Sequence, residues 1–131
     1  MTQLLENIEI ETAPNPQYAV IWLHGLGADG NDFVPLVNEL DLSGLPGIRF
    51  VFPHAKTMPV TINGGYVMRA WYDITGADLT RREDEGGLRA SQRDVEALIA
   101  REKARGIPAS RIILAGFSQG CAMTLQTGMR H

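Results

Sequence analysis

Residues 112–120 read IILAGFSQG, and this stretch decides the predicted fold. Its apolar half is typical of a buried strand, and it runs into a G-x-S-x-G pentapeptide that precedes a segment suited to a helix. A serine at such a junction sits on a sharp turn that needs glycine on either side, because side chains there would collide with neighbouring backbone. The stretch therefore predicts a nucleophile elbow, which presents Ser118 at the edge of a sheet.

A second interpretation of the pentapeptide is a plain tight turn in which Ser118 only caps the helix. The two interpretations are compatible, because the helix N-terminus also adds partial positive charge where negative charge would develop on a reacting oxygen. In a nucleophile elbow the residue after the serine donates its backbone N–H to that oxygen, and here this residue is Gln119.

A glycine-rich loop, HGLGADG at residues 24–30, follows a nearly unbroken apolar run at residues 18–23, which predicts a strand buried on both faces. In a serine hydrolase this loop supplies the second oxyanion donor, here the N–H of Leu26. The span Gly25–Gly30 also fits the G-x-G-x-x-G spacing of a dinucleotide-binding loop, although the next predicted strand ends in Phe-Pro-His without a carboxylate for the ribose. A ligand-free turn in a non-catalytic scaffold module is the third interpretation.

The other predicted elements alternate between strands and helices. A helix capped by Asn31 is expected from the apolar spacing at positions 33, 36, 37 and 40, whereas residues 53–85 show no clear period and suggest long surface loops. The remaining elements are an edge strand at residues 5–11, strands at 48–52 and 111–116, and a helix at 88–105. This order predicts a single α/β domain over residues 1–131, with a mainly parallel sheet and helices on both faces.

Composition narrows the class of partners. The chain has 131 residues, a net charge of −3 and 44% hydrophobic residues, which is ordinary for a globular domain and offers no basic surface for nucleic acid. No apolar run is long enough for an integral membrane span. A single cysteine, Cys121, and an N-terminus without the pattern of a signal peptide predict a cytoplasmic protein.

Four separated blocks resemble the acyl-protein thioesterase and small carboxylesterase (phospholipase/carboxylesterase) group of α/β-hydrolases. The blocks are residues 23–30, 52–61, 64–73 and 116–120. The resemblance implies an α/β-hydrolase fold and a serine hydrolase of carboxylic esters or thioesters that works through an acyl-serine intermediate, without metal or cofactor. It also implies Ser118 as nucleophile, Leu26 and Gln119 as oxyanion donors, and a small ester or thioester, an acylated protein or a lysophospholipid as substrate. Met68 and Trp71 are candidates for the wall of the acyl pocket, with core packing as the alternative for both.

The residues that should complete a catalytic triad are missing from the sequence. In α/β-hydrolases an acid and then a histidine follow the serine, but after Ser118 there is no Asp or Glu, and the only histidine is His131. A straight helix would place His131 roughly 20 Å from the serine. We therefore expect the N-terminal portion of a longer hydrolase, which lacks its C-terminal strands and has little activity alone. We also expect an open sheet edge at residues 111–116, through which the chain would form a homodimer or self-associate.

Overall fold

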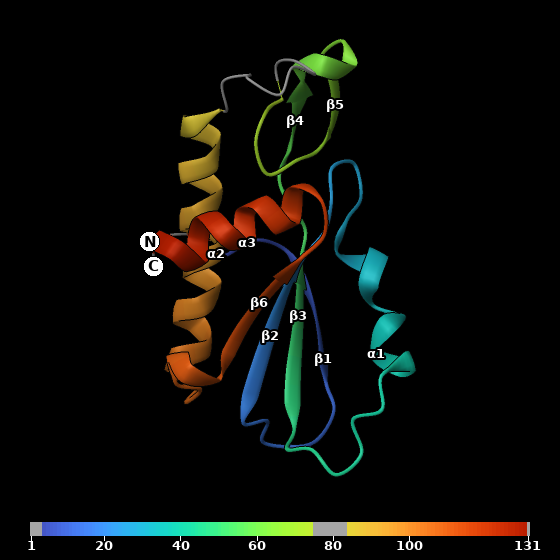
Figure 1. The fold of residues 1–131 in the computed structure, drawn as a ribbon, viewed down its shortest axis with the longest axis vertical. Coiled ribbons are helices and arrows are strands. Elements are labelled where there is room, and N and C mark those ends of the chain that lie inside the picture. The colour runs from blue at the N-terminus through green and yellow to red at the C-terminus, as the bar shows by residue number, and fades with distance from the viewer. Residues whose placement is uncertain (1–3, 75–83, 131) are drawn as a thin grey trace.

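Four strands form the central sheet of the computed structural model, which describes residues 4–74 and 84–130 (Figure 1). The strands are β1 (Asn7–Glu11), β2 (Tyr18–Leu23), β3 (Ile48–Pro53) and β6 (Ile112–Gly116), and their order is β1-β3-β2-β6. Strand β2 pairs in parallel with both β3 and β6, whereas β1 pairs antiparallel with β3. The mainly parallel sheet is therefore confirmed, with the expected edge strand at the N-terminus.

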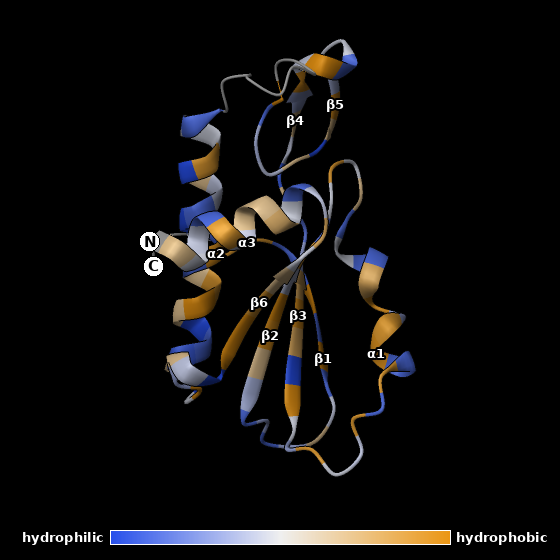
Figure 2. Cartoon of the chain, in the orientation of Figure 1, coloured by the Kyte–Doolittle hydropathy of each residue, from blue (hydrophilic) through white to orange (hydrophobic). Residues whose placement is uncertain are grey.

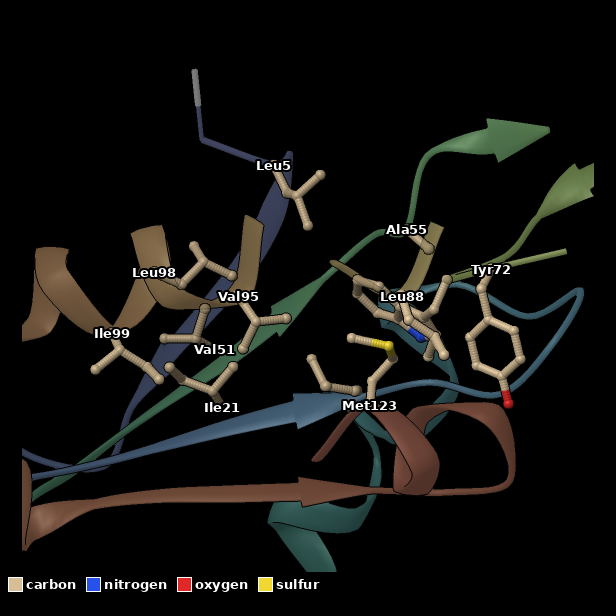
Figure 3. Close-up of a cluster of buried hydrophobic side chains, with 12 residues drawn as sticks. Leu5, Ile21, Val51, Ala55, Tyr72, Leu88, Val95, Leu98, Ile99 and Met123 are labelled. Atoms are coloured by element: carbon tan, nitrogen blue, oxygen red, sulfur yellow. The ribbon is translucent and has the colours of Figure 1, made fainter. Parts of the chain in front are cut away.

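Alternating side chains of the inner strands pack into two separate clusters, because successive residues of a strand point to opposite faces. Ile21, Leu23 and Val51 belong to the larger cluster, which Figure 3 shows in close-up. Val20 and Phe50 belong to the second cluster on the opposite face. Figure 2 colours much of β3 and β6 as hydrophobic, as expected for strands that must be covered on both faces.

Helices α2 (Glu85–Ala104) and α3 (Gln119–Arg130) cover the face of the larger cluster (Figure 1). The predicted apolar stripe of α2 is confirmed, since Leu88, Val95, Leu98 and Ile99 are all buried in that cluster. Asp84 caps the helix by accepting a hydrogen bond from the Gly87 N–H at 2.9 Å. No helix of residues 4–74 and 84–130 is both long and apolar enough to span a membrane.

The opposite face is covered by less regular structure than the sequence suggests. Asp29, not Asn31, provides the cap, because its Oδ1 accepts the Asn31 N–H at 2.8 Å and a short 3₁₀ helix, η1 (Gly30–Phe33), follows. Pro35 has no N–H to continue the ladder, and a separate four-residue helix, α1 (Leu36–Glu39), begins after it. The expected single helix is therefore wrong, although its apolar residues Phe33, Val34 and Val37 do pack against the sheet.

The segment expected to consist only of loops contains a small antiparallel sheet, and that expectation is wrong. Strands β4 (Thr57–Val60) and β5 (Tyr66–Arg69) form it, joined through η2 (Thr61–Asn63). Gly64 and Gly65 adopt φ values of 70° and 80°, which glycine tolerates and other residues rarely adopt. The sequence Asn63-Gly64-Gly65 was a turn signal that could have revealed the hairpin.

Candidate active site

The two glycine-rich loops meet at one edge of the sheet because β2 and β6 run parallel and end together. Leu23 and Gly116, the last residues of these strands, are register partners. The next residue after β6, Phe117, donates its N–H to the Leu23 carbonyl at 3.1 Å. Residues 24–30 and 117–119 therefore leave the sheet side by side, at the carboxyl ends of the strands where open α/β sheets place their sites.

Ser118 occupies a strained turn between β6 and α3. Its φ is +58°, in the left-handed region, and its side chain is exposed. A Cβ on Gly116 would overlap the Gly120 carbonyl, and a Cβ on Gly120 would overlap the Leu23 carbonyl, so both positions require glycine. A non-glycine residue held in this region costs about 1–3 kcal/mol, and such strain is found at active sites that need a side chain in an unusual position.

The loop after β2 lies directly against the serine. A Cβ built on Gly25 would lie 3.3 Å from the Ser118 Cβ and 3.4 Å from the Phe117 carbonyl oxygen. The next residue along this loop is Leu26. Within the described ranges, neither the Leu26 N–H nor the Gln119 N–H donates a hydrogen bond. Both backbone donors that the sequence predicted for an oxyanion are thus on the segments that meet at Ser118, and neither has an acceptor among residues 4–74 and 84–130.

His24 is buried behind this loop, and both of its ring nitrogens are occupied. Its Nε2 accepts the Ala55 N–H at 2.9 Å, which leaves Nδ1 to carry the proton and donate to the Gly25 carbonyl at 2.7 Å. Burial lowers the pKa of His24 below its ordinary value, so the ring is held neutral. These contacts are those of a residue that supports the loop and leave no nitrogen free to deprotonate Ser118.

His54 and Asp73, two further titratable residues near the loops, are held by backbone and hydroxyl groups. The Nδ1 atom of His54 accepts the Gly30 N–H at 2.9 Å. Asp73 accepts the Thr61 hydroxyl at 2.6 Å and the Thr61 N–H at 2.8 Å, and these hydrogen bonds lower the pKa of Asp73. His131 lies outside the described residues. Within those residues no group of three His, Cys, Asp or Glu side chains is arranged to hold a metal.

The two candidates for the pocket wall differ in position. Trp71 is only 1% exposed, belongs to the larger core cluster, and donates its indole N–H to the His24 carbonyl at 2.8 Å. Met68 is half-buried, and its Sδ lies 3.7 Å from the Cβ position of Gly27. Met68 therefore lies beside the loop of residues 24–30, whereas Trp71 packs beneath it.

The sequence predicted a role for the backbone N–H of Gln119 but none for its side chain. Gln119 is 4% exposed, its Oε1 accepts the Trp71 N–H at 2.7 Å, and its Nε2 donates to the Tyr72 carbonyl at 2.8 Å. No signal in the sequence marks this role, because a glutamine in the first turn of a helix is usually solvated.

Comparison with known proteins identifies the family. The model described as Phospholipase/Carboxylesterase matches residues 5–131. The chain is 40% identical to acyl-protein thioesterase 1 of Schizosaccharomyces pombe over 131 residues, which are 100% of this chain and 58% of that protein. It is 45% identical to acyl-protein thioesterase 1 homolog 2 of Dictyostelium discoideum over 122 residues, which are 92% of this chain and 55% of the relative.

Solved structures show the same fold. SOBER1 of Arabidopsis thaliana has a TM-score of 0.79 and 34% sequence identity, with 84% of this chain and 53% of that chain covered. Acyl-protein thioesterase 2 of Zea mays has a TM-score of 0.74 and 29% identity, with 92% and 50% covered. The chain therefore spans little more than half the length of these relatives. The chain belongs to the phospholipase/carboxylesterase family and has an α/β-hydrolase fold.

Proposed function

We propose that this chain carries the nucleophile and the oxyanion hole of a serine hydrolase that cleaves carboxylic esters or thioesters. The observation that carries the proposal is the exposed, left-handed Ser118, against which the loop of residues 24–30 packs. The uncommitted N–H groups of Leu26 and Gln119 support the same conclusion, because donors that are not used by the fold are available to a ligand.

In the proposed reaction the Ser118 Oγ attacks the carbonyl carbon of the substrate and its proton passes to a base. The carbonyl oxygen becomes negative and accepts hydrogen bonds from the N–H groups of Leu26 and Gln119. The carbon–oxygen or carbon–sulfur bond then breaks, the proton moves to the leaving group, and water hydrolyses the acyl-serine. None of these steps requires a metal or a cofactor.

The base and the acid that orients it come, in this proposal, from a segment outside these 131 residues. His24 is occupied at both nitrogens, and residues 119–131 contain no Asp or Glu. The first turn of α3 begins at Gln119, so the positive end of this helix assists the developing charge. The chain alone is then expected to retain only a small residual activity, because a hole without a triad still stabilises the oxyanion.

The names of the relatives favour acylated proteins as substrates, with lysophospholipids and small esters as further members of the same chemical class. Met68 would contact the acyl chain from beside the loop, and Trp71 would support the floor beneath it. We further propose that the protein acts in the cytoplasm, where a single cysteine stays reduced.

A dinucleotide-binding module receives less support from the same loop. The Gly30 N–H already donates to His54, and a Cβ at Gly30 would overlap the Phe52 carbonyl. This glycine is therefore explained by close packing against the end of β3. The helix that follows is a four-residue 3₁₀ turn, which is a poor platform for a pyrophosphate.

Self-association through β6 is part of the proposal. β6 is the outer strand of the sheet beside β2, and Ile113 is exposed on it. A groove of about 320 Å³ between β6, α2 and α3 is lined by Ile99, Ala109, Ile112, Leu114, Thr124 and Gly128. An unpaired strand edge beside an apolar groove favours pairing with another chain.

A fluorophosphonate probe tests the proposed function. The protein is expressed as these 131 residues and as the coding sequence read past His131, each with Ser118 intact and as Ser118→Ala. We expect the extended protein to be labelled and to cleave a thioester, and Ser118→Ala to lose both. The matched control is Ser110→Ala, an exposed serine that precedes β6, which should leave labelling unchanged.

Labelling that persists in Ser118→Ala would contradict the proposal. Nucleotide-dependent thermal stabilisation of an unlabelled protein would favour the dinucleotide interpretation instead.

A further inference from the structure

We propose that the side chain of Gln119 is the positioning residue of the oxyanion hole and joins its two donors into one rigid unit. This inference rests on the function proposed above. It concerns the side-chain amide, which is buried away from the substrate, and not the backbone N–H of the same residue.

The Gln119 amide uses both of its polar atoms to bind the backbone of residues 71 and 72. Its oxygen accepts from the Trp71 N–H at 2.7 Å and its nitrogen donates to the Tyr72 carbonyl at 2.8 Å. Residues 71 and 72 form a bend and belong to no strand, so this side chain supplies hydrogen bonds that a sheet would otherwise provide. The start of α3 is thereby fastened to the segment that follows β5.

The same segment holds the other donor loop. The Arg69 carbonyl accepts the Gly27 N–H at 2.9 Å, and the Trp71 indole N–H donates to the His24 carbonyl at 2.8 Å. His24 in turn donates from Nδ1 to the Gly25 carbonyl at 2.7 Å. Leu26 therefore lies between two residues whose backbone groups are both held, while its own N–H stays uncommitted among the described residues.

Residues 69–72 therefore form hydrogen bonds to both segments that carry the proposed oxyanion donors. Gln119 makes these hydrogen bonds for the segment that contains Ser118. Hydrogen bonds in a buried site are strong and mutually reinforcing, which makes the geometry of such a network well defined. An oxyanion hole depends on donors that are fixed before the reaction begins. Loss of the Gln119 amide should therefore loosen both donors, including the one on the distant loop.

The first test measures this coupling in the 131-residue chain. Gln119→Met keeps the length of the side chain and removes both hydrogen bonds. The matched control is Gln126→Met on the same helix, which removes a 3.0 Å hydrogen bond to Gln92. We expect amide hydrogen exchange at Gly27 to accelerate at least about tenfold in Gln119→Met and not in Gln126→Met. Equal exchange at Gly27 in the two variants would overturn the proposal.

The second test measures catalysis in the protein extended past His131, normalised by titration of Ser118 with the fluorophosphonate. We expect Gln119→Met to lower kcat about 10- to 100-fold with KM changed less than about threefold, because the oxyanion forms only in the transition state. Binding of an aryl boronic acid, whose adduct with Ser118 places a negative oxygen in the hole, should weaken by a similar factor. Gln119→Glu retains the acceptor for Trp71 and should recover part of the loss.

If Gln119 only stabilises the fold, Gln119→Met should lower the fraction of protein that the fluorophosphonate titrates. The kcat per titrated Ser118 would then equal that of Gln126→Met, and this result would overturn the proposal. If Gln119→Met does not fold, Gln119→Glu, which loses only the donor to the Tyr72 carbonyl, provides the same comparison with a smaller expected loss. Absence of Ser118 labelling in the unsubstituted extended protein would refute the proposed function itself, whereas intact labelling with an unaffected Gln119→Met refutes only the positioning role.

Discussion

Gly120 packs so closely on the end of β2 that any Cβ at this position would overlap the carbonyl oxygen of Leu23. The first turn of α3 can approach the sheet only because this side chain is absent. The contact sets the angle at which the helix leaves Ser118 and so controls how far the serine projects from the sheet.

Substitution Gly120→Ala should therefore destabilise the fold by about 1–3 kcal/mol, since the helix or the strand must move apart. Gly128→Ala is the matched control on the same helix, because nothing lies within 4 Å of its Cβ position. That variant should gain roughly 0.5–1 kcal/mol from improved helix propensity. Urea unfolding of both variants measures the contrast, and a similar change in the two would show that the close approach is unimportant.

The left-handed backbone of Ser118 predicts that, of two variants that lack the hydroxyl, only one is more stable than the unsubstituted protein. Ser118→Gly removes the Cβ that makes φ of +58° unfavourable, and should stabilise the fold by about 1 kcal/mol. Ser118→Ala keeps the Cβ and should not show this gain. Thermal unfolding compares them, and equal stability of the two variants would argue against strain at the turn.

Neutral His24 predicts that stability falls with decreasing pH. Burial lowers the pKa of His24 in the folded protein, whereas the pKa of this side chain in the unfolded protein is about 6.5. The unfolded state therefore takes up the proton first, so the contribution is complete above this pH and is lost as the pH falls toward the folded pKa. Because one proton is involved, the slope should not exceed about 1.4 kcal/mol per pH unit.

His24→Gln removes the titrating ring and keeps an acceptor for the Ala55 N–H. The free energy of unfolding, measured by urea between about pH 7.5 and 5, should lose this part of its pH dependence in the variant. An identical slope in the two proteins would place the effect elsewhere.

A buried carboxylate links α2 to the sheet on the side away from the site. Glu102 is fully buried, and its carboxylate contacts Arg49 of β3 at 2.5 Å and Arg105 at 3.3 Å. Glu102→Met removes this shared partner, but Arg49 keeps Glu11 at 2.8 Å and Arg105 keeps Glu9 at 2.5 Å, so the substitution should cost about 1.5–3 kcal/mol. Asp94→Asn breaks the 3.4 Å pair with the exposed Lys56 and should cost less than about 1 kcal/mol. The free energy of unfolding, measured with denaturant for both variants, tests this difference. A small loss of stability in Glu102→Met would mean that the ion pairs of Glu102 are not needed for the stability of the fold.

Self-association through β6 is tested by a charge on the strand. Ile113→Lys should lower the fraction of dimer or larger species in sedimentation velocity, because lysine on an edge strand opposes pairing with another chain. Leu45→Lys is the control, since Leu45 has a similar exposure, 56% against 52%, and lies in a loop. If both variants associate like the unsubstituted chain, β6 is not the contact.

The spacing of apolar residues predicted those helices and strands whose secondary structure is determined by their own residues. The stripe of α2 was visible because Val95, Leu98 and Ile99 recur at helical spacing, and residues 18–23 were visible as a strand because they are apolar throughout. The sharp turn at Ser118 could be predicted for a related reason, since Gly116 and Gly120 lie between an apolar strand and a segment suited to a helix.

The features that were not predicted depend on specific hydrogen bonds and on the missing N–H of a proline, which the periodicity of apolar residues does not reveal. The apolar spacing after residue 31 matched a helix, but the Asp29 cap and the missing N–H of Pro35 divide it. The side chain of Gln119 is buried because the backbone of residues 71 and 72, far away in sequence, has groups that need partners. Such long-range pairing can be seen only once the fold is known.

The register of Leu23 with Gly116 also has a consequence for the order of events during synthesis. The loop at residues 24–30 leaves the ribosome long before Ser118, so a nascent chain exposes one half of the centre while the other is still untranslated. Pairings between distant segments form slowly, because the intervening chain must first be closed into a loop. The left-handed turn at Ser118 therefore reaches its final geometry only after β6 has joined the sheet beside β2.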